Sequence, residues 1–263
     1  PNVKVIVLFP KDKVSKRQEK QLTCWGDNIL SLTVNGTFDD CQALVKDIFV
    51  DPKLSSRYRF SSANSINFGR LLPQSIYYAH SSLNHYRQSG NKVNFIIPTG
   101  NLGNGMACLL AREMGFPVGE IVLSVNENRL IADYLNGAEW LPKSSIQTLA
   151  NAMDVGNPSN MERLSGLFGQ ADDLKDLISA VSVSDENISS EITRIFEKTN
   201  TIICPHTATA SYAYSQFTDE VKMSQDWFIA ATAHPAKFET IVEPLIGQKV
   251  AIPDDLLALL DKP

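Results

Sequence analysis

Short apolar runs alternate with amphipathic stretches along most of the chain. The apolar runs are rich in Val, Ile, Leu and Phe and are too short for typical helices. They predict strands over residues 3–9, 28–34, 93–97, 120–125, 202–204 and 227–233. The amphipathic stretches predict helices over residues 15–23, 39–49, 106–114, 146–153, 172–178 and 190–198. Strands that alternate with helices predict an α/β fold with open, mostly parallel sheets flanked by helices.

A polar link from Asp51 to Arg59, which contains a proline, interrupts this alternation. We expect a domain boundary there, with residues 1–56 as part of a smaller α/β domain and residues 57–263 as a larger α/β domain. The first predicted strand starts almost at Pro1, and the chain has no initiator methionine. We therefore expect residues upstream of Pro1 and a fold that is incomplete at the N-terminus.

Composition places the chain among ordinary globular proteins, with 43% hydrophobic and 20% charged residues. A net charge of −5 gives no reason to expect nucleic acid or an anionic membrane as a partner. The four cysteines form no close pairs, so neither a metal site nor a disulfide framework is expected. There is no apolar run of membrane-spanning length and no visible signal peptide, so we expect a cytoplasmic protein.

The most informative stretch runs from Lys92 to Pro117, where a buried strand, a glycine-rich turn and a helix start follow one another. Backbone N–H groups in such a turn converge at the positive end of the helix, which suits a phosphate. The glycine spacing matches neither the dinucleotide fingerprint nor the P-loop. The alternative is a turn without a ligand, which contains glycines only because its backbone requires positive φ. The polar residues Thr99, Asn101 and Asn104 favour an organophosphate.

A second polar cluster precedes a helix that we expect to run to about Tyr86. Asn64, Ser65 and Asn67 could simply cap that helix. Arg70 follows about one turn after Asn67, and an arginine beside such donors at a helix N-terminus indicates a second anion site. Two anion sites on one α/β scaffold suggest a phosphorylated cofactor together with a phosphorylated or carboxylate substrate.

Other polar residues follow predicted strands, where ligands bind in open α/β sheets. Thr99, Asn126, His206 and Thr232 all lie near such carboxyl ends. The segment from Asn151 to Arg163 is rich in turn and cap residues. It could hold a site, but its composition favours a loop-and-cap network.

These residues carry a resemblance to the threonine synthases, pyridoxal-phosphate enzymes with the tryptophan synthase β-like fold (fold type II). The matching stretches keep the family's order and cover nearly the whole chain. They are residues 8–21, 38–49, 62–74 (SANSINFGRLLPQ), 98–105 (PTGNLGNG), 151–163 (NAMDVGNPSNMER), 204–210 (CPHTATA) and 232–238 (TAHPAKF).

The resemblance implies an enzyme that converts O-phospho-L-homoserine and water to L-threonine and phosphate, with pyridoxal 5'-phosphate as the electron sink. It implies that the cofactor phosphate is cradled by Gly100, Asn101, Leu102, Gly103 and Asn104, and that Thr232 bonds the pyridine nitrogen. By the same match, the substrate phosphate is bound by Asn64, Ser65, Asn67 and Arg70.

The chain also departs from the family pattern. The motif of the type HGPT-x-x-FKD, which carries the Schiff-base lysine, is absent, and so is the TSGDTG-type loop that grips the substrate carboxylate. Lys237 lies in TAHPAKF, which the family has in addition to its catalytic lysine. The chain also stops before the family's usual C-terminal extension. We therefore identify no catalytic residue, expect the middle and C-terminal part of such an enzyme, and expect this polypeptide alone to be inactive.

Two alternatives remain open. A paralogue of the same fold, a phospho-lyase or dehydratase acting on another amino acid, would keep the glycine-rich loop and change the substrate side. The match from Asn64 to Arg70 argues against a simple dehydratase, which has no substrate phosphate to hold. The chain could also be a non-catalytic fragment that binds a phosphorylated metabolite.

Overall fold

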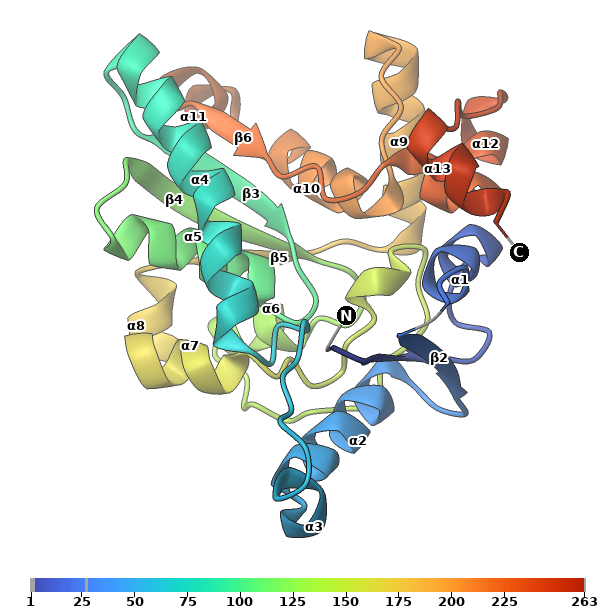
Figure 1. The fold of residues 1–263 in the computed structure, drawn as a ribbon. Helices are drawn as coiled ribbons and strands as arrows, with labels where there is room; N and C mark the ends of the chain where they lie inside the picture. Colours follow the sequence, from blue (N-terminus) through green and yellow to red (C-terminus); the bar gives the residue numbers. More distant parts are fainter. Residues whose placement is uncertain (1–2, 27, 263) are drawn as a thin grey trace. The chain divides into compact units, whose positions relative to one another are not determined.

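A computed structural model describes residues 3–26 and 28–262 (Figure 1). The chain forms two compact units, each discontinuous in sequence. The first unit comprises Pro1–Phe60, Ile192–Pro205 and Ala233–Pro263, and the second comprises Ser61–Glu191 and His206–Thr232. The sequence had placed 192–205 and 233–263 in the larger domain, whereas their contacts group them with the N-terminal segment. The assignment of domains as 1–56 and 57–263 stays a prediction.

The first unit opens with two parallel strands and their helices. Its elements are β1 (Val5–Pro10), α1 (Lys16–Thr23), β2 (Ile29–Val34), α2 (Phe38–Val50), α3 (Pro52–Ser55), η2 (Pro235–Phe238), α12 (Glu239–Ile246) and α13 (Asp254–Leu260). β1 pairs with β2 in register from Val5–Ile29 to Pro10–Val34. Ser15 and Thr37 start α1 and α2 through capping boxes, as their positions before amphipathic runs suggest.

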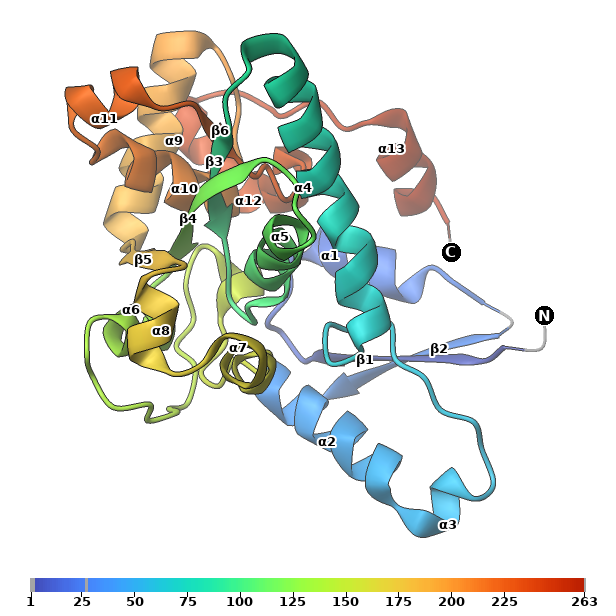
Figure 2. The same cartoon turned by 90° about the vertical axis from the view of Figure 1, so that its left-hand side faces the viewer.

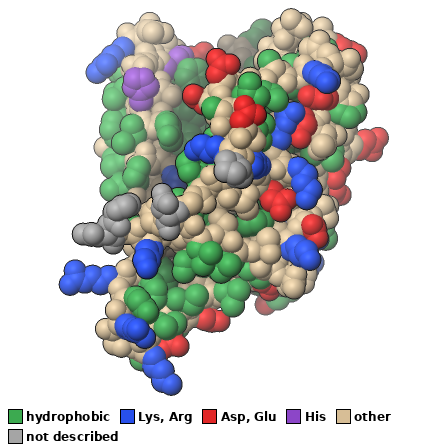
Figure 3. Space-filling view, turned by 45° about the vertical axis from the view of Figure 1, so that its right-hand side comes forward, with side chains coloured by type: hydrophobic (Ala, Val, Ile, Leu, Met, Phe, Trp, Pro, Cys, Tyr) green, Lys and Arg blue, Asp and Glu red, His purple; other side chains and the backbone are tan. Residues whose placement is uncertain are grey.

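Hydrophobic side chains lie at the surface among polar and charged ones (Figure 3). In the first unit they include Ile6 and Leu30, which are 64% and 54% exposed. Parallel sheets are usually buried on both faces, so this two-stranded sheet leaves an unusual amount of apolar area in water.

The second unit is built on a four-stranded parallel sheet in the order β5-β4-β3-β6. The strands are β3 (Val93–Pro98), β4 (Val118–Val125), β5 (Ser179–Ser182) and β6 (Trp227–Ile229). The helices are α4 (Phe68–Ser89), α5 (Gly103–Glu113), α6 (Leu130–Leu135), η1 (Asn151–Met153), α7 (Met161–Phe168), α8 (Ala171–Lys175), α10 (Pro205–Ser215) and α11 (Asp219–Ser224). The helix α9 (Asp185–Thr199) begins in this unit and continues into the first unit from Ile192. The predicted α/β class with parallel sheets is confirmed.

Helices cover both faces of this sheet, α4 and α5 on one side and α10 on the other (Figure 2). Successive side chains of a strand point to opposite faces, and the burial follows that rule. Phe95 and Ile97 pack in the main core with residues of α4 and α5. Ile96 between them packs against Ala210 and Ala213 of α10. Every residue of β3 is buried as a result, which explains why its sequence is apolar apart from Asn94.

Three expected elements differ in the structure. β6 ends at Ile229, well before the predicted end of that strand, and residues 202–204 form no strand. The predicted helix over residues 146–153 is irregular except for η1. Its backbone N–H groups bond side chains instead of helical carbonyls: Ile146 N donates to Asn128 Oδ1 (2.8 Å), and Thr148 N donates to Asp154 Oδ2 (3.0 Å).

Among the described helices, none is both long and apolar enough to cross a membrane. Within the same described residues, no group of three or more His, Cys, Asp or Glu is arranged to hold a metal ion.

Candidate functional site

The glycine-rich loop, residues 99–104, leads from the end of β3 into the first turn of α5. Leu102 adopts a left-handed conformation (φ 62°) directly before the helix starts at Gly103. A left-handed residue followed by helical ones turns consecutive N–H groups toward one point. No described side chain caps α5, and Met106 makes the first backbone bond of the helix, to Leu102 O (2.9 Å). The first-turn N–H groups are therefore free to bind an anion.

Close packing, and not positive φ, explains the glycines of this loop. None of Gly100, Gly103 and Gly105 has a positive φ. The alternative explanation, that the turn contains these glycines only to allow positive φ, therefore does not apply. A Cβ at Gly100 would lie 2.7 Å from Met153 Cα, and a Cβ at Gly103 would lie 3.0 Å from Ser65 Cβ. Leu102 is the loop residue with the strained, left-handed backbone. It is 1% exposed, so burial of its side chain holds the backbone in that conformation.

Neighbouring elements hold the polar side chains of the loop. Asn101 Nδ2 donates to Ser65 Oγ (2.9 Å), and Asn101 Oδ1 accepts from the Ser159 backbone N (2.6 Å). Asn104 Oδ1 accepts from the phenolic O–H of Tyr78 (2.6 Å). Burial raises the pKa of Tyr78 well above its ordinary value, so the phenol keeps the proton it donates. The buried hydroxyl of Thr99 has no hydrogen-bond partner among the described residues.

The segment from Asn64 to Asn67, here called the 64–67 loop, lies against the glycine-rich loop through Ser65. Asn67 is the N-cap of α4: its Oδ1 accepts from Gly69 N (3.0 Å), and its Nδ2 donates to Ser62 O (2.8 Å). The capping alternative therefore accounts for Asn67. Arg70 is exposed one turn later, with its guanidinium beside Gln74. The structure thus joins Ser65 to the glycine-rich loop, keeps Asn64 beside Ser65 through the bond from Ser65 Oγ to Asn64 Oδ1 (3.3 Å), and leaves Arg70 on the surface of α4.

Two residues that sequence reasoning left out of the predicted site complete this arrangement. Asn160 Nδ2 donates to Asn101 O (2.8 Å), and Arg163 Nη1 donates to Ser65 O (2.9 Å). The sequence signal was the polar NPSNMER segment at a helix start, which also fits an ordinary cap network. Only the fold reveals that its partners are the two loops.

The polar residues predicted at other strand ends have different surroundings. Thr232 is exposed three residues beyond β6, which is the neighbour of β3 in the sheet. His206 is buried, its Nε2 accepts from Ala152 N (3.1 Å), and burial lowers its pKa to about 4. It is therefore a neutral structural acceptor. Asn126 Nδ2 donates to Asp154 Oδ1 (2.8 Å) within the buried end of a loop, which makes its role structural as well.

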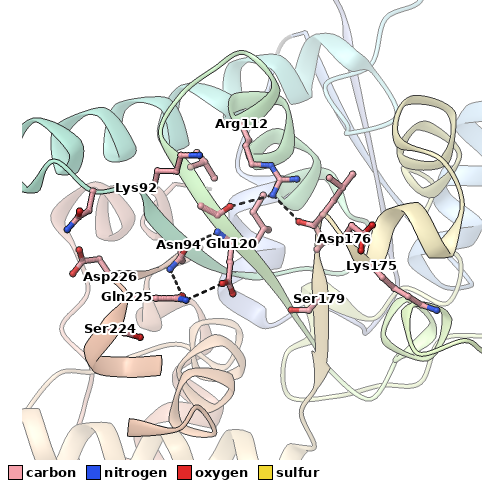
Figure 4. A pocket seen from close by; sticks show the side chains of 16 residues that line it. Lys92, Asn94, Arg112, Glu120, Lys175, Asp176, Ser179, Ser224, Gln225 and Asp226 are labelled. Atoms are coloured by element: carbon pink, nitrogen blue, oxygen red, sulfur yellow. Dashed lines mark hydrogen bonds between the residues drawn. The ribbon is translucent and has the colours of Figure 1, made fainter. Parts of the chain in front are cut away.

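A separate cavity of about 750 Å³ opens at the amino ends of the same strands (Figure 4). Three of its polar side chains bond one another: Asn94 Nδ2 donates to Gln225 Oε1 (2.9 Å), and Gln225 Nε2 donates to Glu120 Oε1 (3.2 Å). Ligands of open α/β sheets bind at the carboxyl ends of strands, where the glycine-rich loop lies. We therefore place the candidate site at that loop and not in this cavity.

Comparison with known proteins identifies the family to which the chain belongs. A family model described as "Pyridoxal-phosphate dependent enzyme" matches residues 2–231. The chain belongs to this family. Within it, the chain is 39% identical over its whole length to threonine synthase of Buchnera aphidicola subsp. Acyrthosiphon pisum and 36% identical to that of Escherichia coli. It spans 60% of the length of each of these two relatives.

Solved structures of family members show the same architecture. The crystal structure of threonine synthase from Escherichia coli matches the whole chain with a TM-score of 0.90, and the chain covers 60% of it. The pyridoxal-phosphate-bound threonine synthase from Brucella melitensis matches with 27% identity and a TM-score of 0.85, 61% of it being covered. These findings confirm the resemblance to threonine synthases and the tryptophan synthase β-like fold. Serine racemase from Dictyostelium discoideum, at 16% identity, shares the fold alone (TM-score 0.59).

Proposed function

We propose that the protein carrying this chain is a threonine synthase, which uses pyridoxal phosphate to convert O-phospho-L-homoserine and water to L-threonine and phosphate. One observation carries the proposal: an uncapped helix N-terminus, suited to one phosphate, is hydrogen-bonded through Asn101 and Ser65 to a second polar loop. The threonine synthases to which the chain is 36–39% identical support this reading.

The residues present fit pyridoxal phosphate. The N–H groups of Gly100 to Asn104 would bind its phosphate, and the orphaned hydroxyl of Thr99 offers a further donor at the same loop. Thr232 would bond the pyridine nitrogen. A hydroxyl at that place, unlike a carboxylate, leaves the ring nitrogen largely neutral. When bound, the cofactor supplies an electron sink for the substrate carbanion.

The chain's own residues bind and orient the reactants. Asn64, Ser65 and Arg70 would hold the substrate phosphate at the helix start that Asn67 caps, and Asn101 would keep Ser65 beside the cofactor loop. Asn104 keeps its Nδ2 available as a donor, because Tyr78 occupies its Oδ1. We assign no residue of this chain to proton transfer, and no lysine of the chain to the Schiff base.

Asn104→Asp tests the cofactor site with little change in shape. The Tyr78 bond can persist, but a carboxylate would face the cofactor phosphate at the helix start. We expect equilibrium dialysis to show at least tenfold weaker retention of pyridoxal phosphate, which is about 1.4 kcal/mol. Asn91→Asp, an exposed change at the other end of the sheet, is the matched control. Equal retention by the two folded variants would refute the assignment of the loop.

Phosphate release from O-phospho-L-homoserine by the purified full-length protein tests the reaction. Threonine formed with equimolar phosphate supports the proposal. Pyridoxal-phosphate-dependent turnover of L-serine, without action on the phosphorylated substrate, would point to a dehydratase. Binding of phosphorylated metabolites without turnover would favour a non-catalytic binding protein.

A further inference from the structure

Arg163, in the first turn of α7, connects segments that lie far apart in the sequence. Its Nη2 donates to Ile66 O, and its Nη1 donates both to Ser65 O (2.9 Å) and to Asn160 Oδ1 (2.5 Å). Asn160 in turn donates from Nδ2 to Asn101 O (2.8 Å). Since Asn101 donates to Ser65 Oγ (2.9 Å), the contacts form a closed ring around the two loops.

These contacts hold two consecutive peptide groups at both ends. Arg163 binds the carbonyls of Ser65 and Ile66, while Ile66 N donates to Asn64 Oδ1 (3.2 Å) and Asn67 N donates to Asn64 O (3.0 Å). A loop that binds an anion has to turn its carbonyl oxygens away from it. The guanidinium of Arg163 binds two of these carbonyl oxygens at once, through a planar fork of N–H donors that lysine lacks.

The charge of Arg163 has no counter-ion in the described part of the chain. All its described hydrogen-bond acceptors are neutral oxygens, and no ion pair among the described residues includes it. A half-buried cation without an acid beside it is costly unless an anion compensates it. Its position directly behind the 64–67 loop would supply positive potential to a bound phosphate.

We propose that Arg163 is a positioning residue that fixes the 64–67 loop against the glycine-rich loop and supplies the charge that attracts the anion. The inference rests on the proposed function for the identity of the ligands, and it extends that function to a residue outside the predicted site. Arg163 acts through Ser65, Ile66 and Asn160, so it is not assigned to contact substrate.

Two substitutions separate charge from geometry in the purified full-length protein. Arg163→Gln removes the charge and the fork, whereas Arg163→Lys keeps the charge alone. Amide hydrogen exchange at Ile66 and Asn67 reports the geometry of the loop. Equilibrium dialysis with inorganic phosphate and with pyridoxal phosphate reports anion binding. Arg129→Gln, at the exposed N-cap of α6, is the matched control.

We expect Arg163→Gln to accelerate exchange of both amides and to weaken phosphate binding at least tenfold. Arg163→Lys should also accelerate exchange but should recover part of the phosphate affinity. Wild-type exchange and affinity in Arg163→Gln would overturn the inference. Faster exchange with affinity within twofold of wild type would overturn it as well, because the residue would then be structural only.

The wild-type protein distinguishes this inference from the proposed function. If it binds inorganic phosphate in an Arg163-dependent manner but does not retain pyridoxal phosphate, the proposed function fails and the inference stands. If it binds no phosphate at all, the inference fails, because the loop then holds no anion.

Discussion

Tyr78→Phe tests whether a buried phenol sets the orientation of Asn104. The substitution removes only the O–H that donates to Asn104 Oδ1 (2.6 Å). The aromatic ring can stay in place, because its edge contact with Phe95, at a centroid distance of 5.0 Å, involves no oxygen. The change therefore isolates one hydrogen bond at the start of α5.

The expected cost follows from the environment of the bond. Loss of a neutral hydrogen bond costs roughly 0.5–1.5 kcal/mol, and an acceptor left without a partner adds to that. Asn104 is only half-buried, so water can partly replace the phenol. We expect the free energy of unfolding to fall by about 1–2 kcal/mol, a loss of roughly 2–8 °C in Tm for a chain of this size.

The substitution should weaken ligand binding as well as stability. Without the phenol, the side-chain amide of Asn104 can rotate and present its oxygen to the cofactor phosphate. We expect the affinity for pyridoxal phosphate to fall severalfold. Thermal unfolding and equilibrium dialysis measure the two effects. Tyr77→Phe is the control, since Tyr77 is the preceding residue of α4 and is 71% exposed. If the two variants were alike in both measurements, the role assigned to Tyr78 would be refuted.

Three further predictions concern other residues. Arg70→Ala should weaken binding of O-phospho-L-homoserine by roughly 1.5–3 kcal/mol, seen as a raised KM with cofactor absorbance intact; unchanged kinetics would move the substrate phosphate elsewhere. Burial raises the pKa of Asp154 to about 6, although hydrogen bonds from Thr148 and Asn126 lower it. Its contribution to stability is therefore fully present below pH 3.8 and is lost as the pH rises through about 6, and Asp154→Asn should remove that part of the pH dependence of unfolding. Finally, the polypeptide of residues 1–263 alone should form no threonine. Borohydride treatment with pyridoxal phosphate and peptide mapping should find no uniquely labelled lysine, and one such lysine together with phosphate release would contradict this.

Local sequence determined the strand, loop and helix of the candidate site. The apolar run before Pro98, the glycines and the amphipathic stretch after them predicted β3 and α5, and the structure confirms both. Such elements depend on periodicity and turn chemistry within a few residues, so they can be predicted without knowledge of the fold. The resemblance to threonine synthases also rested on short contiguous motifs.

Only the tertiary structure decided which polar residues contact the loops of the candidate site. In the sequence, Asn67, Asn126 and Arg163 are equally plausible caps, ligands or surface residues. In the structure, Asn67 caps α4, Asn126 holds a buried loop, and Arg163 binds the 64–67 loop. The partners of Arg163 in that loop lie 97 and 98 residues away, and local pattern carries no information on contacts of that range.

The irregular segment before Asn151 shows the same physical limit. Its apolar spacing predicted a helix, but Thr148 N bonds Asp154 and Leu149 N bonds Asp185, 36 residues further along the chain. A backbone N–H group can make a helical bond or a side-chain bond, and the side chains available are set by how distant segments pack. Sequence therefore determined the elements whose hydrogen bonds close locally, whereas tertiary packing determined the loops whose hydrogen bonds are completed by distant residues.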